Sequence, residues 1–393
     1  MNHRAGIRFP RPSRSAVVAA AAVLALFPAI EASKAHETDQ YTLPLDRRFA
    51  DLGNYLDAVH TRAIEASVQS INGQIRTALR DRNESRRAER LAALHEPRRL
   101  VKAVYGKFND AFTEILDIED AVRGEWARKS FPDQVTANLR VDWIYTYTHL
   151  PIDPRRLILI WQSSTIKAHG VYFGTDKLSH FHHMGMFYYD TYRAFLREGK
   201  TNKDALAATI AQYSDAGIIG ENALLGFVPT GVYSNADLAA NLCGFKFYQN
   251  ITEPVTLKGR VCPPLVVRVG PYWRLNRHVR PESGWFGEFI SDHWNEALNP
   301  NHYADTYIAQ NVASEMRKRS ANIVTFYTTI DNRPGDAVYY DFLAEKLKTY
   351  FGEPYGHRGG HEELLTIGNT CIPELERRTA ERDRAATRSG VLP

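Results

Sequence analysis

The sequence predicts a mainly α-helical protein with a helical bundle-like core and few short strands. Long stretches rich in Ala, Arg, Glu and Leu carry apolar residues at spacings of three and four, which is typical of helices that bury one face. Candidate caps and Gly or Pro breakers separate these stretches. Residues 265–269 are the best strand candidate, because a short apolar run with β-branched residues is followed there by a Gly-Pro turn.

The N-terminal half is expected to contain two long helices, over residues 49–94 and 101–127. Apolar residues recur along the second at spacings of three and four, which indicates a buried stripe. Further helices are expected to begin near Thr175 and at Ser234, where Asp237 follows in the pattern of a capping box. The other expected helices cover residues 201–225, 285–296, 303–328 and 336–351.

The first 35 residues have the layout of a secretory signal peptide. Basic residues precede an apolar run at residues 16–30, and Ser33-Lys34-Ala35 offers small residues at the cleavage positions. The run is shorter than the roughly 20 apolar residues that a membrane span needs, although an uncleaved anchor is an alternative. The expected regions are a signal peptide at 1–35, an N-terminal helical region at 36–135, a core helical domain with the polar site at 136–310, C-terminal helices at 311–373 and a solvated tail at 374–393.

The charge balance bears on the partners of the protein. The whole chain has 49 Lys and Arg and 45 Asp and Glu, a net charge of +4. Residues 1–35 hold five of these basic residues and one acidic residue, so the rest has 44 of each and is formally neutral. This balance does not favour a nucleic-acid partner, which needs a basic surface. No later apolar run approaches the length of a membrane span, so we expect a soluble or peripheral mature protein.

Three cysteines, Cys243, Cys262 and Cys371, leave the redox chemistry open. In an oxidising compartment one pair can form a disulfide and leave one thiol over, and Cys243 with Cys262 is the closer pair in sequence. Three free cysteines are the alternative, and the spacing does not decide between the two.

The segment that starts at Gly174 is rich in residues with acid–base chemistry. Asp176, His180 and His183 have the spacing i, i+4 and i+7, which places their side chains on one face of an α-helix, whereas His182 points away. Lys177 lies beside this face. A carboxylate next to an imidazole can orient its tautomer and raise its basicity, so the segment predicts one wall of a polar site.

A second wall is expected on the helix that starts at Ser234. Asp237, Asn241 and Gly244 repeat the spacing i, i+4 and i+7, and Gly244 would let another backbone or a ligand come close. Glu221 precedes this helix and supplies a further carboxylate. Because a buried polar group is costly unless it is paired, we expect these residues to form one shared cluster.

The expected roles in this site follow from the residue types. The candidates for proton transfer or nucleophilic attack are Asp176, His180, Glu221 and Asp237. The candidates for holding a substrate oxyanion or phosphate are Lys177, Asn241 and Ser234. A divalent metal is an alternative cofactor, and its first candidate ligands are His180, His183 and Glu221.

The pattern Asp176-Lys177-x-x-His180-Phe181, then Glu221, then Ser234-x-x-Asp237-x-x-x-Asn241-x-x-Gly244 resembles that of VanZ-like proteins and of small YfiM-type lipoproteins of the bacterial envelope. It covers about 70 of the 393 residues. The resemblance implies an α-helical core and an envelope role, but no settled reaction. VanZ-like proteins are integral to the membrane, and the lipoproteins carry a lipidated cysteine; this chain has no such cysteine at its expected cleavage point.

The resulting expectation is an exported bacterial envelope protein that is periplasmic or peripheral to the envelope. As an enzyme it would be a hydrolase or transferase that acts on a phosphorylated or lipid-linked envelope substrate through a His/Asp/Glu site. The alternative is a non-enzymatic envelope protein whose polar cluster is a structural hydrogen-bond network. The expected partners are an envelope lipid or glycan in either case.

Overall fold

Helices dominate the computed structural model, which describes residues 36–108, 118–140, 142–145, 161–216, 220–222, 231–303, 306–360 and 362–388. All of these residues belong to one unit, Ala35–Pro393. The prediction of a mainly α-helical fold is confirmed, because the strands among the described residues form only two-stranded pairs. The expected signal segment, residues 1–35, lies outside the described residues.

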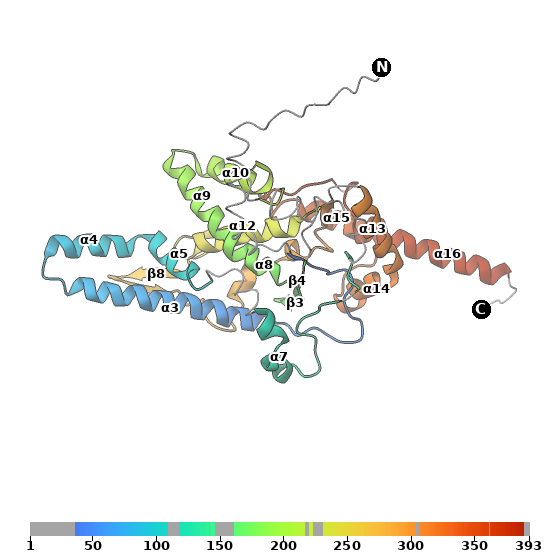
Figure 1. Ribbon diagram of the computed structural model, residues 1–393, viewed down its shortest axis with the longest axis horizontal. Coiled ribbons are helices and arrows are strands. Elements are labelled where there is room, and N and C mark those ends of the chain that lie inside the picture. Colours follow the sequence, from blue (N-terminus) through green and yellow to red (C-terminus); the bar gives the residue numbers. More distant parts are fainter. Residues whose placement is uncertain are drawn as a thin grey trace, which may run out of the picture. The chain divides into compact units, whose positions relative to one another are not determined.

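The N-terminal helical region is a hairpin and not the single helix that was expected over residues 49–94. α3 (Gly53–Leu79) and α4 (Glu84–His95) lie side by side (Figure 1). The turn between them is set by Asn83, whose side chain accepts a hydrogen bond from the Arg86 N–H and so caps α4. Pro97 starts the next helix, α5 (Pro97–Tyr105), because a proline at the first helical position loses no hydrogen bond. α5 ends at Tyr105, so the helix expected over residues 101–127 is interrupted early.

The helices that carry the candidate site follow a short antiparallel pair, β3 (Thr165–Ala168) and β4 (Val171–Gly174). β4 leads directly into α8 (Asp176–Ser179), which continues as the π-helix η1 (His180–Met184) and then as α9 (Gly185–Arg197). α12 (Asn235–Asn250) packs against both η1 and α9.

The contact between α12 and η1 is a close approach of two backbones. A Cβ atom at Gly244 would lie 1.8 Å from the carbonyl oxygen of Phe181, and one at Gly185 would lie 2.5 Å from the Gly244 carbonyl carbon. The expectation that Gly244 admits another backbone is therefore confirmed. The absence of both side chains brings the α12 side chains within hydrogen-bonding distance of those on α8 and η1.

The best strand candidate is confirmed as β8 (Val266–Val269), which pairs with β9 (Tyr272–Leu275) around a Gly-Pro turn. The helix expected over residues 285–296 is instead two short 3-10 turns, η3 (Trp285–Glu288) and η4 (Asp292–Trp294). The remaining strands are β1 (His36–Glu37) with β2 (Trp161–Gln162), β5 (Val232–Tyr233) with β10 (His302–Tyr303), and β6 (Val255–Leu257) with β7 (Arg260–Cys262).

The other helices follow the expected order with additional breaks. The helix expected over residues 303–328 is divided at Arg319. The structure has α7 (Glu125–Ser130), α10 (Asn202–Ala211), η2 (Gln212–Ala216), α13 (Thr306–Lys318), α14 (Ser320–Thr325), η5 (Phe326–Ile330), α15 (Ala337–Leu347), η6 (Ile367–Cys371) and α16 (Ile372–Arg388).

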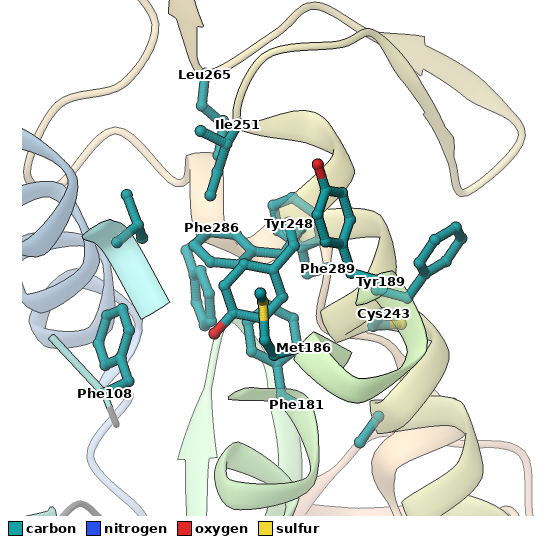
Figure 2. Packing of buried hydrophobic residues seen from close by; sticks show 14 of the residues in the cluster. Phe108, Phe181, Met186, Tyr189, Cys243, Tyr248, Ile251, Leu265, Phe286 and Phe289 are labelled. Carbon is teal, nitrogen blue, oxygen red and sulfur yellow. The ribbon is translucent and has the colours of Figure 1, made fainter. Parts of the chain in front are cut away.

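Aromatic side chains fill the core beside the candidate site. Phe181 from η1 packs with Phe286 and Phe289, and Tyr248 of α12 lies nearby (Figure 2). All three cysteines are free, so the question of a disulfide is answered in favour of unpaired thiols. None of the helices in the described part of the chain has the length and apolarity needed to cross a membrane.

Candidate functional site

Lys177 lies at the centre of a buried group of carboxylates. Its Nζ lies 3.0 Å from Asp176 Oδ2, 2.6 Å from Asp237 Oδ1 and 2.5 Å from Glu296 Oε1. The lysine and Glu296 side chains are fully buried, and each aspartate side chain exposes 4% or less. Burial alone would lower the pKa of Lys177, but the three carboxylates hold this pKa well above its usual value, so the ammonium stays charged.

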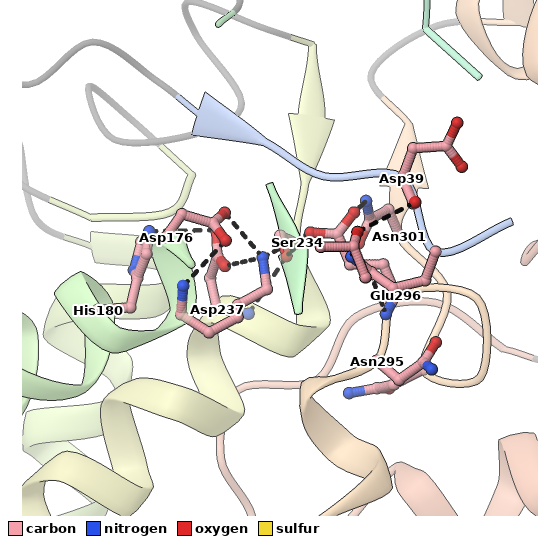
Figure 3. A network of polar contacts seen from close by, with 12 residues as sticks. Asp39, Asp176, His180, Ser234, Asp237, Asn295, Glu296 and Asn301 are labelled. Atoms are coloured by element: carbon pink, nitrogen blue, oxygen red, sulfur yellow. Dashed lines mark hydrogen bonds and ion pairs between the residues drawn. The ribbon is translucent and has the colours of Figure 1, made fainter. Parts of the chain in front are cut away.

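His180 is the residue of this cluster that reaches solvent, with 15% of its side chain exposed. Its Nε2 lies 3.2 Å from Asp237 Oδ2, and its Nδ1 lies 3.1 Å from Asn241 Oδ1. Figure 3 shows Asp176, His180 and Asp237 on one side of Ser234, with Glu296 on the other. Asp237, on a separate helix, therefore orients the imidazole, while Asp176 faces the lysine.

The N-terminus of α12 positions two further residues that the sequence analysis singled out. Ser234 is the N-cap, as expected, since its Oγ accepts a hydrogen bond from the Asp237 N–H at 3.2 Å. Glu221 Oε1 accepts a hydrogen bond from the Ser234 N–H at 2.8 Å. Glu221 and Asp237 thus both lie at the positive end of the α12 dipole. Ser234 is fully buried, so it supports the site from inside and does not face an open surface.

Glu296 is a site residue that the sequence analysis missed. Its Oε2 accepts a hydrogen bond from Asn301 Nδ2 at 3.1 Å, and its backbone N–H donates to Gln40 Oε1 at 2.9 Å. The signal available in the sequence was a glutamate within the apolar and aromatic stretch at residues 285–298. Such a stretch is expected to be buried, and a buried carboxylate needs a cation.

The acidic side chains of the cluster outnumber its cations, and burial shifts their pKa values upward. Burial raises the pKa of Glu296 to about 7, with the Lys177 ammonium opposing the shift. Burial, followed by the charge of Asp237, raises the pKa of Glu221 well above its usual range. Burial, followed by the charge of Glu296, does the same for Glu37. A carboxyl group with a pKa of about 7, as for Glu296, can exchange protons under physiological conditions, which is what acid–base chemistry requires.

The π-helix η1 separates the histidines of the segment. A π-helix has more residues per turn than an α-helix, so side chains rotate away from the spacing expected for an α-helix. His183 Nδ1 lies 3.3 Å from the Tyr105 hydroxyl, so the face predicted for His183 together with His180 does not form. His182 points into the aromatic core, where its Nε2 lies 3.0 Å from His60 Nε2.

The expected metal ligands His180, His183 and Glu221 are not brought together. The described residues contain one group of three ligand-bearing side chains with oxygens within 4.8 Å of one another: Asp176, Asp237 and Glu296. Lys177 Nζ contacts an oxygen of each of these three carboxylates. A divalent cation at this position would be repelled by the Lys177 ammonium. These three carboxylates therefore fit an ammonium group, and they would accept a metal only after Lys177 had moved or lost its proton.

The expected substrate-binding roles also change. Lys177 was expected to hold a phosphate or an oxyanion, but its ammonium is enclosed by carboxylates and is fully buried. Asn241 lies beside His180, where it can still contact a molecule that approaches the imidazole. Lys177 therefore compensates the charge of the carboxylates, and Asn241 is the predicted binding residue that lies beside the partly exposed His180.

Comparison of the chain with family models, with curated proteins and with solved structures finds no match. The resemblance to VanZ-like and YfiM-type proteins therefore rests on the motif residues alone. Those residues do converge in the structure: Asp176, Lys177, His180, Glu221, Ser234, Asp237 and Asn241.

Proposed function

We propose that the chain is an exported protein of the bacterial cell envelope and that the cluster around Lys177 is the acid–base site of a hydrolase or transferase. The observation that carries this proposal is the link between His180 and the buried carboxylates. His180 is partly exposed, Asp237 binds its Nε2, and Lys177 joins Asp237 to Glu296. A proton-transfer group needs contact with substrate or water and a partner that stabilises its charge, and His180 with Asp237 offers both.

The charge of the cluster supports proton transfer at His180. When Glu296 is neutral, the charges of Lys177 and a protonated His180 balance those of Asp176 and Asp237. Since the pKa of Glu296 is raised to about 7, its neutral form is well populated at physiological pH. The site can therefore hold a proton on His180 without an excess of charge in its buried part.

In the proposed reaction His180 acts as general base or general acid, and Asp237 keeps the proton on Nε2 in place. Nδ1 exchanges a proton with the substrate or with water after Asn241 has turned away. The proposed substrate is a phosphorylated or lipid-linked envelope molecule, a class that follows from the envelope role implied by the motif. The signal-peptide layout of residues 1–35 supports export.

One observation favours a second function. Both ring nitrogens of His180 already have partners inside the protein, Asp237 and Asn241. A cluster whose groups are all paired internally is suited to tie α8, α12 and the loop after η4 together. The protein would then be a non-enzymatic envelope protein, and its polar cluster a structural network.

The two functions are separated by a His180→Gln variant, with His183→Gln as the matched control in the same π-helix. The purified proteins are incubated with an extract of envelope lipids and glycans, and products are followed by mass spectrometry. Acid–base catalysis predicts product from the wild type and from His183→Gln, none from His180→Gln, and a fall in Tm of only about 2–4 °C for His180→Gln. A structural network predicts no product from any of the proteins and a much larger fall in Tm for His180→Gln.

A further inference from the structure

Basic residues concentrate in two stretches that pack against each other. Residues 70–108 contain ten Lys and Arg against four Asp and Glu, and residues 254–281 contain six against none. Asn72 joins them, since its Nδ2 donates to the Trp273 carbonyl at 2.8 Å and its Oδ1 accepts from the Trp273 N–H at 2.9 Å. We call these two stretches the basic lobe. Because residues 36–393 are formally neutral, the rest of that part of the chain carries an equal acidic excess.

Many cations of the basic lobe are available to an outside partner. Arg86 and Arg90 are close to Asp81, at 3.7 Å and 3.2 Å. Other arginines of the lobe are exposed and form no ion pair with any described residue: Arg76, Arg80, Arg82, Arg268, Arg274, Arg277 and Arg280. The field of such unpaired surface charges reaches an anion within about 10 Å at moderate ionic strength.

Exposed apolar side chains lie among these arginines. Leu79, at the end of α3, is 38% exposed, and Val269, at the β8–β9 turn, is 47% exposed. In the antiparallel register Val269 pairs with Tyr272 and Val267 with Arg274. Because alternate residues of a strand share a face, Val269 and Arg274 lie on the same face of the hairpin. The lobe thus presents aliphatic groups and guanidinium groups together.

A groove of about 680 Å³ lies in the basic lobe, between α3 and the helices α4 and α5. Two arginines, Arg90 and Arg99, and one carboxylate, Glu96, contribute charge to its lining, and Ala78 and Leu94 contribute apolar surface. This combination fits a lipid phosphate together with the first part of an acyl chain, since guanidinium groups bind phosphate oxygens and the apolar surface takes the hydrocarbon.

We propose that the basic lobe binds the surface of an anionic phospholipid membrane. The unpaired arginines attract lipid phosphates, and Leu79 and Val269 enter the interfacial layer. A single-stranded nucleic acid would use the same arginines, but it binds through stacking on aromatic side chains and not through aliphatic ones. The cluster around Lys177 lies outside the basic lobe, so membrane binding does not depend on the acid–base function.

Sedimentation with vesicles tests this proposal. The full chain, and in parallel the chain from Ala35 onward to remove the apolar run at residues 16–30, is mixed with phosphatidylcholine vesicles with or without about one third phosphatidylglycerol. We expect binding to the phosphatidylglycerol vesicles at low salt and its loss at high salt. The triple variant Arg76→Gln/Arg80→Gln/Arg82→Gln is expected to bind roughly 100-fold more weakly.

The matched control removes the same number of exposed charges outside the basic lobe, with Lys203→Gln/Arg382→Gln/Arg384→Gln. We expect this control to bind within about twofold of the wild type, since its charges lie away from the membrane. Circular dichroism checks that both triple variants are folded. Equal binding by the two triple variants would overturn the proposal. A wild-type chain that does not bind the anionic vesicles would also overturn the proposal, whether or not it binds a single-stranded oligonucleotide.

Discussion

His180 and His182 stand two positions apart in the same π-helix, yet their surroundings are opposite. His180 lies in a charged cluster and is partly exposed, with Asp237 at its Nε2. His182 is fully buried among aromatic rings, with Phe108 stacked at 4.0 Å and His60 at 5.1 Å between ring centroids. One histidine is available for proton exchange, and the other is part of the core. The spacing of an α-helix predicted that His182 points away from His180, and the structure confirms this; the packing around each histidine decides what surrounds it.

The histidines of the core form a neutral hydrogen-bonded chain. His60 Nδ1 donates to the Leu56 carbonyl at 2.7 Å, so its Nε2 accepts from His182 Nε2 at 3.0 Å. His182 Nδ1 is then left to accept from the Tyr248 hydroxyl at 3.5 Å. Burial lowers the pKa of His60 to about 4 and that of His182 well below its usual value. Each ring therefore carries a single proton at neutral pH.

The charged cluster around His180 and the aromatic core around His182 respond to pH in opposite directions. Between pH 4.5 and about 7 the folded state binds more protons at Glu296 than the unfolded state does, so this group lowers stability as the pH rises. Between pH 6.5 and about 4 the unfolded state binds more protons at His60, so this group lowers stability as the pH falls. Substitutions that affect one region and spare the other can separate these contributions.

The largest effect is expected from Gly244→Ala, because it disturbs both regions at once. The new Cβ would lie 1.8 Å from the carbonyl oxygen of Phe181, which stands between His180 and His182, and backbone cannot yield as a flexible side chain does. The free energy of unfolding in urea should fall by more than about 5 kcal/mol, beyond the ~1–3 kcal/mol usual for overpacking. Gly73→Ala is the control, since its Cβ meets nothing closer than 3.7 Å, and it should stabilise α3 by about 0.5–1 kcal/mol. Similar losses in the two variants would contradict the close helix contact.

Lys177→Met breaks the charged cluster and leaves the aromatic core intact. Removing the cation from three buried carboxylates should cost about 3–5 kcal/mol in urea unfolding. The cost should be larger above pH 7 than near pH 4.5, because Asp176 and Glu296 can take up protons once the ammonium is gone. The exposed Lys203→Met should change stability by less than about 0.5 kcal/mol. A pH-independent loss would show that the carboxylates do not share the charge of Lys177.

His60→Phe tests the core in the same way and leaves the charged cluster intact. The wild type should lose about 3 kcal/mol through His60 as the pH falls from 6.5 to 4, since the pKa of His60 is lowered to about 4. Phenylalanine keeps the ring stacked on Phe286 but does not titrate. Unfolding in urea across this pH range should show the acid-induced loss reduced by that amount. An unchanged slope would mean that His60 is not buried in its neutral form.

The smallest effects on stability are expected at the two ends of α12, which connects the charged cluster to the aromatic core. Ser234→Ala removes the N-cap at the charged end and should cost about 1 kcal/mol. Tyr248→Phe removes a long hydrogen bond of 3.5 Å at the aromatic end and should cost no more than about 1 kcal/mol. Thermal unfolding of the single and double variants checks both, and the two losses should add because the sites share no partner.

Local sequence patterns predicted much of the fold and part of the site. The start of α12 at Ser234, the strand at residues 266–269 and the close approach at Gly244 were all predictable, because caps, turns and small residues act through their immediate neighbours. The break between α3 and α4 and the replacement of the helix at residues 285–296 were not. In those places short-range turn preferences and packing outweighed helical periodicity.

The sequence alone established that the protein is mainly helical and that Asp176, His180 and Asp237 belong to one polar cluster. Only the tertiary structure decided which groups pair inside it. Glu296 reaches Lys177 across 119 positions of the chain, and the π-helix turns His183 away from the cluster. A buried charge pairs with whichever group the packing brings within about 3 Å. The identity of that group depends on contacts between distant segments, which no local pattern encodes.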